Sequence, residues 1–172
     1  MCGIIGYKGK RKASEVLLKG IKNLEYRGYD SVGMTTIFNN NLETKKDKGK
    51  VEEVNKRLNF LDLDGNIGIA HTRWSTHGIP NKENSHPHLS NNKSIAVVHN
   101  GIIENYEELR KELKKLGYKF NSETDTEVIP ILIEEYCKKY EFEEALIKTL
   151  QRLKGSYSLV IIKKDSNKLI GV

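Results

Sequence analysis

The chain has 172 residues, a formal net charge of +6 and 37% hydrophobic residues, which are the size and composition of one globular domain. No apolar run is long enough to span a membrane and no signal-peptide pattern is present, so we expect a cytoplasmic protein without a membrane partner. Its basic residues lie in mixed-sign segments, which are typical of solvated helix faces and argue against a nucleic-acid partner.

In the first half of the chain, short strands alternate with helices. Residues 4–5 begin a strand, and apolar residues recur at helical spacing over residues 16–24. Residues 34–38 are typical of a strand, and the asparagines at 39–41 of a hairpin turn. The pattern then predicts a helix over residues 51–61 and a buried strand over residues 67–70 that runs into polar residues.

The second half is richer in helices. A strand is predicted over residues 94–98, and Asn105 with Glu108 indicates a capping box that opens a helix ended by Gly117. Two further helices follow, over residues 128–136, with Pro130 in the first turn, and over residues 142–153. Residues 157–163 and 169–172 are typical of two strands joined by a turn.

Short turns and paired helices favour an α+β fold, in which antiparallel sheet is packed by helices, over a parallel βαβ array. We see no repeat and no linker, so residues 1–172 are expected to form one domain. Because the chain ends inside a predicted strand, we expect that domain to be C-terminally incomplete, a piece of a longer polypeptide.

Cys2 is the first candidate for chemistry, since only Met1 precedes it. Cysteine is small enough for removal of the initiator methionine, which would leave a free α-amine beside the thiol. A thiolate is a strong nucleophile, and an α-amine titrates near neutral pH, which suits a general base. The alternative is a structural cysteine at the start of an apolar strand, which we also expect for Cys137 within its helical pattern.

Polar residues that suit a small ligand gather in three predicted loops. In the first loop, residues 71–78, Arg73 can bind a carboxylate and Trp74 can cover a site. In the second loop, Asn100 and Gly101 offer two N–H donors to one oxygen, although Asn-Gly is also a common turn. In the third loop, residues 122–127, Asp125 can bind an ammonium group or cap the next helix. Together with a nucleophile, these groups fit glutamine.

Six segments of the chain, in order, resemble one family. They are Cys2-Gly3-Ile4, LEYRGYDSVG (24–33), AHTRWSTHG (70–78), HPH (86–88), VVHNGIIEN (97–105) and SETDTE (122–127). They are similar to the glutaminase domain, a class II glutamine amidotransferase, of the isomerizing glutamine–fructose-6-phosphate aminotransferases or glucosamine-6-phosphate synthases. The resemblance implies the four-layer αββα sandwich of the N-terminal-nucleophile hydrolases.

The resemblance also implies residue roles. Cys2 would attack the amide of L-glutamine, form a thioester and release ammonia for hexosamine synthesis, and its α-amine would act as base. Asn100 and Gly101 would form the oxyanion hole. Arg73 would bind the α-carboxylate of glutamine, with Thr76 and His77 beside it. Asp125 would bind the α-ammonium group. Trp74 would gate the passage of ammonia, and Arg27 would brace the pocket.

The resemblance leaves part of such an enzyme out of this chain. The sugar isomerase domains, which would bind fructose 6-phosphate, are not in the sequence, so the chain is expected to supply ammonia only. The family implies no cofactor and no metal, and a homodimer for the full-length protein.

Three alternatives stay open. The first alternative is a metal hydrolase whose metal ion is bound by histidines, although no HExxH or CxxC spacing is present. The candidate ligands would be His71, His77, His86, His88 and His99. The chain would otherwise be a non-catalytic glutamine-binding fragment, or the glutaminase domain of another class II amidotransferase.

Overall fold

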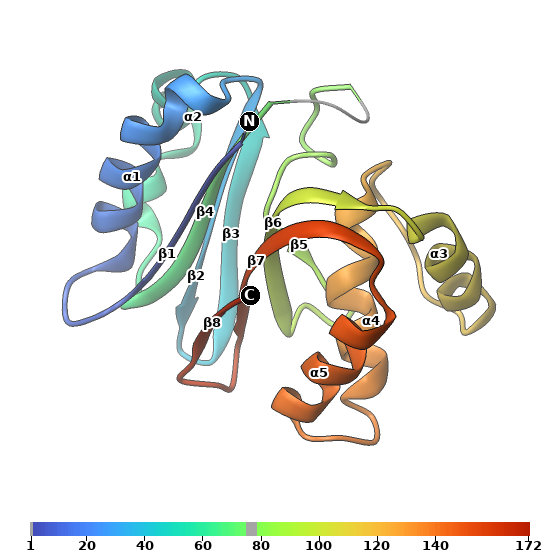
Figure 1. The fold of residues 1–172 in the computed structure, drawn as a ribbon. Helices are drawn as coiled ribbons and strands as arrows, with labels where there is room; N and C mark the ends of the chain where they lie inside the picture. The colour runs from blue at the N-terminus through green and yellow to red at the C-terminus, as the bar shows by residue number, and fades with distance from the viewer. Residues whose placement is uncertain (1, 75–78) are drawn as a thin grey trace.

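The computed structural model of the chain describes residues 2–74 and 79–172, which form four layers (Figure 1). Two antiparallel sheets lie face to face, and helices cover the outer face of each sheet. The first sheet has the order β1-β4-β2-β3, with β1 Gly3–Lys8, β2 Ser31–Phe38, β3 Asn41–Lys48 and β4 Ile67–Arg73. The second sheet has the order β5-β6-β7-β8, with β5 His88–Leu89, β6 Ile95–Ile103, β7 Gly155–Lys163 and β8 Leu169–Gly171.

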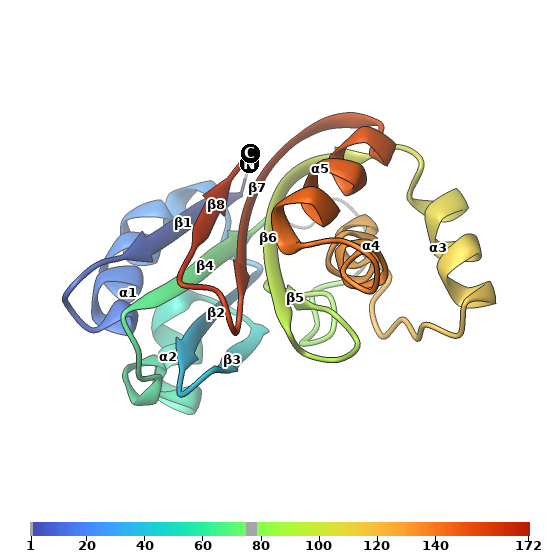
Figure 2. The same cartoon turned by 90° about the horizontal axis from the view of Figure 1, so that it is seen from below.

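The helices are divided between the two outer layers, as the view from below also shows (Figure 2). The first sheet is covered by α1 Ala13–Leu24 and α2 Val51–Leu58. The second sheet carries α4 Val128–Tyr136 and α5 Phe142–Arg152, and α3 Tyr106–Lys115 packs beside α4. Three short 3-10 helices complete the described elements, η1 Glu25–Arg27, η2 Phe60–Asp62 and η3 Asp125–Glu127. In the described part of the chain, no helix is long and apolar enough to cross a membrane.

Three hydrophobic clusters fill the three gaps between the layers. One joins α1 and α2 to the first sheet around Leu17, Ile21 and Phe60. Another lies between the two sheets and includes Ile69 and Val98. The largest joins the second sheet to its helices. β4 and β6 are covered on both faces, one by the other sheet and one by helices. Because both faces are buried, their central residues form continuous apolar runs without alternating polar residues.

The layer between the sheets changes from apolar to polar along the strands. Alternate residues of a strand face the same side, so Ile67 and Ile69 of β4 are followed on that face by His71 and Arg73. On β6 the same face carries Ala96 and Val98 and then Asn100. The apolar end forms the core, and the polar end builds a site beside Cys2.

Several sequence predictions are confirmed in this fold. Asn39 and Asn40 have positive φ values of 48° and 57°, as a two-residue hairpin turn between β2 and β3 requires. Gly117, with a φ of 90°, follows the C-terminal end of α3. Pro130 lies in the first turn of α4, where its missing N–H costs no helical hydrogen bond.

Other local predictions were wrong. The expected capping box at Asn105 does not form, because the side chain of Asn105 instead bonds the carbonyl of Arg152 and the N–H of Lys154. The strand predicted over residues 94–98 continues to Ile103, so Asn100 and Gly101 lie in β6 and pair with Ser158 and Tyr157. His71 to Arg73 likewise belong to β4 and not to a loop.

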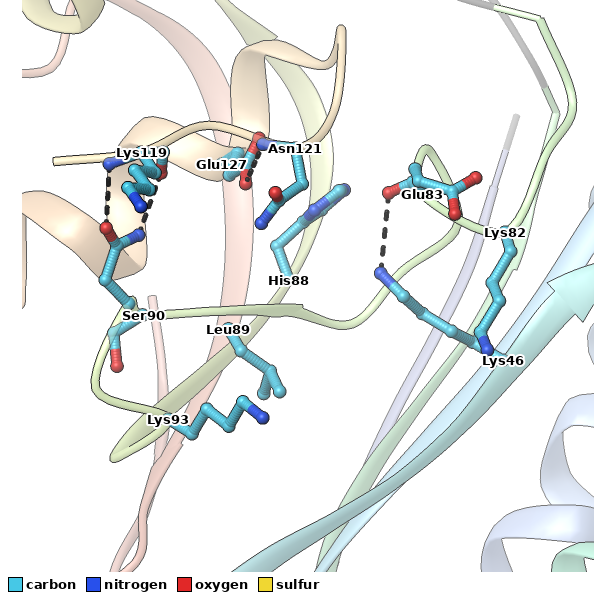
Figure 3. Close-up of a pocket in the computed structure, with 11 residues that line it drawn as sticks. Lys46, Lys82, Glu83, His88, Leu89, Ser90, Lys93, Lys119, Asn121 and Glu127 are labelled. Atoms are coloured by element: carbon cyan, nitrogen blue, oxygen red, sulfur yellow. Dashed lines mark hydrogen bonds between the residues drawn. The ribbon is translucent and has the colours of Figure 1, made fainter. Parts of the chain in front are cut away.

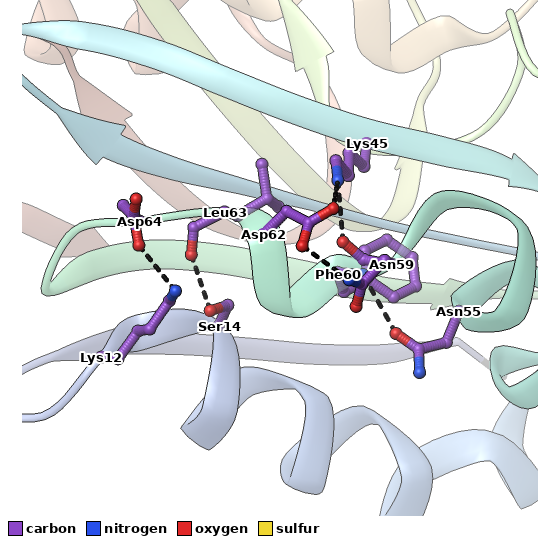
Figure 4. A network of polar contacts seen from close by, with 9 residues as sticks. All are labelled: Lys12, Ser14, Lys45, Asn55, Asn59, Phe60, Asp62, Leu63 and Asp64. Atoms are coloured by element: carbon purple, nitrogen blue, oxygen red, sulfur yellow. Dashed lines mark hydrogen bonds and ion pairs between the residues drawn. The ribbon is translucent and has the colours of Figure 1, made fainter.

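The helix predicted over residues 51–61 ends earlier, at Leu58 (Figure 4). Asn59 adopts a left-handed φ of 47°, and the N–H of Phe60 donates to Oδ1 of Asn55 at 3.0 Å. Lys45 on β3 then donates to the carbonyl of Asn59 and to Asp62. These polar contacts turn the chain back, so that the 3-10 helix η2 packs against α1.

Candidate active site

Cys2 lies directly before β1 and beside the end of β4. Its Sγ accepts a hydrogen bond from the backbone N–H of Trp74 at 3.2 Å and lies 3.6 Å from the Trp74 carbonyl oxygen. The Cys2 carbonyl oxygen accepts a hydrogen bond from Nδ2 of Asn100 on β6 at 3.1 Å. The half-buried thiol is therefore held where β1 begins and β4 ends in the first sheet, next to Asn100 within β6 of the second sheet.

Two cavities share Cys2, Trp74, Asn100 and Gly101 among their lining residues. The smaller, of about 40 Å³, is completed by Arg73, His86, His99, Thr124, Asp125 and Thr126. The larger, of about 390 Å³, is completed by Arg27, Ile102, Ser156, Tyr157 and Ser158. All the predicted site residues within the described part of the chain therefore line one of these two cavities. Thr76 and His77, which were also predicted, lie outside the described residues.

The smaller cavity carries one fixed positive and one fixed negative group. Arg73 is 5% exposed; burial lowers the pKa of its guanidinium, and the nearby Cys2, Asp125 and Asp30 counteract this shift. Oδ2 of Asp125 accepts a hydrogen bond from the N–H of Ile103 at 2.8 Å, which fixes the carboxylate against β6. A cation and an anion on one small cavity match the carboxylate and ammonium groups of an α-amino acid.

Gly101 is the position at which this site requires glycine. Its φ is 131°, a conformation that other residues rarely adopt, and a Cβ there would lie 2.1 Å from the carbonyl oxygen of Ser156 on β7. The close strand pairing therefore depends on a residue without a side chain. That pairing also fixes the backbone N–H of Gly101 beside the side chain of Asn100.

Trp74 and Arg27 lie on the side of the larger cavity. The Trp74 ring is 44% exposed and packs edge-on against Tyr29, with ring centroids 5.4 Å apart. Arg27 ends the 3-10 helix η1 that follows α1, and its side chain is half-buried. The exposed indole of Trp74 therefore belongs to a residue that lines both cavities beside Cys2. That Trp74 covers the site stays a prediction.

Four histidines from β4, β5, β6 and the segment before β5 form a buried cluster next to the smaller cavity. The rings of His71 and His86 stack with centroids 4.2 Å apart, and His88 meets His86 edge-on at 4.7 Å. Oγ1 of Thr126 lies 3.0 Å from Nε2 of His86 and 2.8 Å from Nδ1 of His99. The cluster thus connects both sheets to the loop that carries Asp125.

Burial keeps this histidine cluster neutral. It lowers the pKa of His71 to about 3 and holds those of His86 and His88 well below their usual value. Neighbouring histidines and Arg73 oppose a further positive charge on His86. Sequence reasoning placed these residues within the family motifs and named them as candidate metal ligands, but gave them no other role. Within the described residues, no group of three or more histidine, cysteine or acidic side chains is arranged to hold a metal ion, so they lend the metal hydrolase no support.

Glu127 organises the loop that presents Asp125, a role that sequence reasoning missed. The side chain is 4% exposed and accepts hydrogen bonds from the N–H of Asn121 at 2.9 Å and the N–H of Ser122 at 2.8 Å. The hydroxyl of Ser122 donates a third, at 2.7 Å. The sequence signal is the position of Glu127 directly before a helix, where a carboxylate commonly bonds nearby N–H groups.

Replacing Glu127 with glutamine should loosen this loop. The new NH₂ group would face a backbone N–H, so we expect the free energy of unfolding to fall by about 1–3 kcal/mol. Urea denaturation measures this loss. Glu123→Gln is the matched control, because Glu123 is exposed and glutamine keeps an acceptor for Asn84. Equal stability of the two variants would contradict the role of Glu127.

A separate cavity of about 380 Å³ is rich in lysine and contains none of the predicted site residues (Figure 3). Burial lowers the pKa of Lys46 to about 8, and Glu127 and Glu83 partly counteract the shift. Nζ of Lys46 donates to the carbonyl oxygens of Ser85 at 2.6 Å and Pro87 at 3.0 Å. Lys46 therefore fastens β3 to the segment that carries His86.

Comparisons with known proteins identify the family to which this chain belongs. A family model described as a glutamine amidotransferase domain matches residues 71–172, and the chain belongs to this family. It is 54% identical to the isomerizing glutamine–fructose-6-phosphate aminotransferase of Pyrococcus horikoshii and 51% identical to that of Methanococcus maripaludis. Both matches cover 100% of this chain but only 31% and 30% of those proteins, so the chain spans less than a third of their length.

A solved structure shows the same fold. The glutamine phosphoribosylpyrophosphate amidotransferase of B. subtilis superposes with a TM-score of 0.83 and 26% identity, over 95% of this chain and 35% of that one. These findings confirm the predicted class II amidotransferase family and the αββα fold of the N-terminal-nucleophile type.

Proposed function

We propose that this domain hydrolyses L-glutamine to glutamate and ammonia through a thioester on Cys2. The observation that carries the proposal is the position of the Cys2 thiol on a small cavity that also holds Arg73, Asp125 and Asn100. The Arg73 guanidinium would bind the α-carboxylate of glutamine, and the Asp125 carboxylate would bind its α-ammonium group. The side-chain amide of glutamine would then extend toward Sγ.

The reaction divides into two steps. The thiolate adds to the amide carbon, and the resulting oxyanion is stabilised by N–H donors of Asn100 and Gly101. As this intermediate collapses, the C–N bond breaks, the amide nitrogen takes up the proton that the thiol gave up and leaves as ammonia, and a γ-glutamyl thioester remains. Water adds to the thioester and releases glutamate and the thiol. Once Met1 is removed, the α-amine of Cys2 would carry the protons between these groups.

We further propose that the ammonia serves hexosamine synthesis from fructose 6-phosphate in a longer, homodimeric cytoplasmic protein. The relatives at 54% and 51% identity are isomerizing glutamine–fructose-6-phosphate aminotransferases, which supports fructose 6-phosphate as the acceptor of the ammonia. The fold match to a phosphoribosylpyrophosphate amidotransferase at 26% identity is weaker support for another acceptor. Trp74 would gate ammonia, and Arg27, Thr76 and His77 would complete the glutamine site.

Replacing Cys2 with alanine tests the hydrolysis directly. We expect the rate of ammonia release from glutamine to fall by about 10⁴-fold or more, because no other group supplies the covalent step. A glutamine-analogue diazo-ketone should label residue 2 of the parent chain, with Met1 absent in the labelled peptide. Intact mass and peptide mapping locate the label.

The matched control is Cys137→Ala. Cys137 lies at the C-terminal end of α4, and burial raises the pKa of its thiol, so it should neither react with the diazo-ketone nor contribute to hydrolysis. A processed chain that binds glutamine without hydrolysing it or reacting at Cys2 would favour the non-catalytic fragment. Activity that survives Cys2→Ala would exclude the thioester.

A further inference from the structure

Two hydrogen bonds determine how the amide of Asn100 is oriented. The Cys2 carbonyl oxygen can only accept, so the Asn100 atom that faces it at 3.1 Å is the NH₂ group. The oxygen Oδ1 of Asn100 consequently points away from Cys2, toward Nε2 of His71 at 3.0 Å. An NH₂ group has two hydrogen atoms, and only one of them is used by the Cys2 carbonyl.

His71 must then be the donor in its bond to Asn100. Its Nε2 lies 3.0 Å from Oδ1 of Asn100 and 3.0 Å from the carbonyl oxygen of His99, and both of these atoms only accept. The ring is fully buried and stacked on His86, so its plane is fixed. The remaining nitrogen, Nδ1, has no hydrogen-bond partner in the structure, as a ring that carries its proton on Nε2 permits.

We infer that His71 is a positioning residue, whose Nε2–H holds the amide of Asn100 with its free N–H turned toward the oxyanion that forms on glutamine. Without this bond the amide could rotate and present its oxygen to the oxyanion, which would repel it. Donation to Oδ1 also polarises the amide and strengthens its N–H as a donor. His71 itself touches neither the substrate nor the thiol.

Burial makes this arrangement insensitive to pH. The pKa of His71 is lowered to about 3, chiefly by burial, so the ring stays neutral with one N–H across the pH range in which a glutaminase works. A charged ring would still donate from Nε2, but burial disfavours it first, and His99 and Arg73 also lower the pKa of His71. The bond to Asn100 is therefore present before substrate arrives, as preorganised stabilisation requires.

The first experiment reads the protonated ring nitrogen of His71 in the parent chain and uses a substitution only to assign its signals. Long-range ¹H–¹⁵N spectra of the histidine-labelled chain report which ring nitrogen carries the proton, and His71→Gln identifies the His71 signals. We expect the Nε2–H form of His71 at every pH between about 8 and 5.5, above its lowered pKa. A proton on Nδ1 would overturn the inference, since no donor would then face Asn100.

The second experiment compares His71→Leu with His71→Gln. Glutamine places an amide N–H the same number of bonds from Cβ as Nε2 of histidine, whereas leucine removes the donor and keeps an apolar side chain. Because an oxyanion donor contributes to kcat and not to ground-state binding, we expect His71→Leu to lower kcat about 10- to 100-fold with KM changed by less than about threefold. His71→Gln should recover most of that loss.

A pair of inhibitors separates positioning from a general loss of structure. The aldehyde analogue of glutamine adds to the thiol and creates the oxyanion, whereas L-norvaline has the same carbon chain and no side-chain oxygen. His71→Leu should weaken the aldehyde about 10- to 100-fold and leave norvaline unchanged. Equal weakening of both ligands, or no weakening of the aldehyde, would overturn the inference.

This inference rests on the proposed glutaminase function, but the two fail differently. A parent chain that neither hydrolyses glutamine nor binds the aldehyde would refute the function, while the spectra would still report the His71 proton. An active parent chain with an Nδ1-protonated His71 would refute only the positioning role.

Discussion

Replacing Gly101 with alanine is expected to remove nearly all of the proposed glutaminase activity and much of the stability. The φ of 131° costs an L-residue about 1–3 kcal/mol, and a Cβ placed 2.1 Å from the Ser156 carbonyl oxygen forces β6 and β7 apart. Because that shift moves both Gly101 and Asn100, we expect kcat to fall by about 10²-fold or more. Ammonia release and urea denaturation measure the two effects.

Gly117→Ala is the matched control for backbone strain. Gly117 also has a positive φ, of 90°, but a Cβ there would have no atom within 4 Å. We therefore expect it to lose only about 1 kcal/mol of stability and no activity. A Gly101→Ala variant with kcat within about tenfold of the parent would show that the strand pairing does not fix the oxyanion donors.

Mild acid should unfold the domain well above the pH at which carboxylates titrate. The folded chain holds His71, His86 and His88 with lowered pKa values, whereas in the unfolded chain they titrate near 6.5. The unfolded state therefore binds more protons below pH 6.5, and stability falls as the pH drops from there toward the lowered pKa values. At pH 5 His71 alone should remove about 2 kcal/mol of stability, and His86 and His88 should lower the stability further in the same direction. An ordinary domain has a total stability of only about 5–15 kcal/mol.

Urea denaturation between about pH 7.5 and pH 5 tests this loss. His88→Gln keeps a donor or acceptor for Oγ1 of Thr124, which lies 3.0 Å from Nε2 of His88, and removes one titrating ring. Its stability should depend on pH less steeply than that of the parent, by about 1.4 kcal/mol per pH unit. Constant stability down to pH 5 would show that the buried rings are charged in the folded chain.

Local sequence signals predicted most elements of this fold. The turn predicted over residues 39–41 forms at Asn39 and Asn40, while Asn41 already belongs to β3. Gly117 and Pro130 were assigned correctly, because each has backbone preferences that hold in any context. The edge strands β3 and β5 were not predicted. β3 consists largely of charged residues, three of which are half-buried, and β5 has only two residues, so neither shows an apolar alternation.

The prediction of a capping box at Asn105 was wrong because residues distant in the sequence bond the same side chain. The pattern at Asn105 and Glu108 is locally correct, but the carbonyl of Arg152 and the N–H of Lys154 compete for the same amide from 47 and 49 residues away. Such long-range partners become visible only when the second sheet and its helices are assembled.

The sequence by itself determined which groups are available for chemistry, because the cysteine, the arginine, the aspartate and the Asn-Gly pair lie in short motifs whose residue types limit what they can do. Only the tertiary structure decided how these groups act together. It extended β4 and β6 so that Arg73 and Asn100 face Cys2. It also buried His71 behind Asn100, since residues 29 positions apart meet only when two sheets pack face to face.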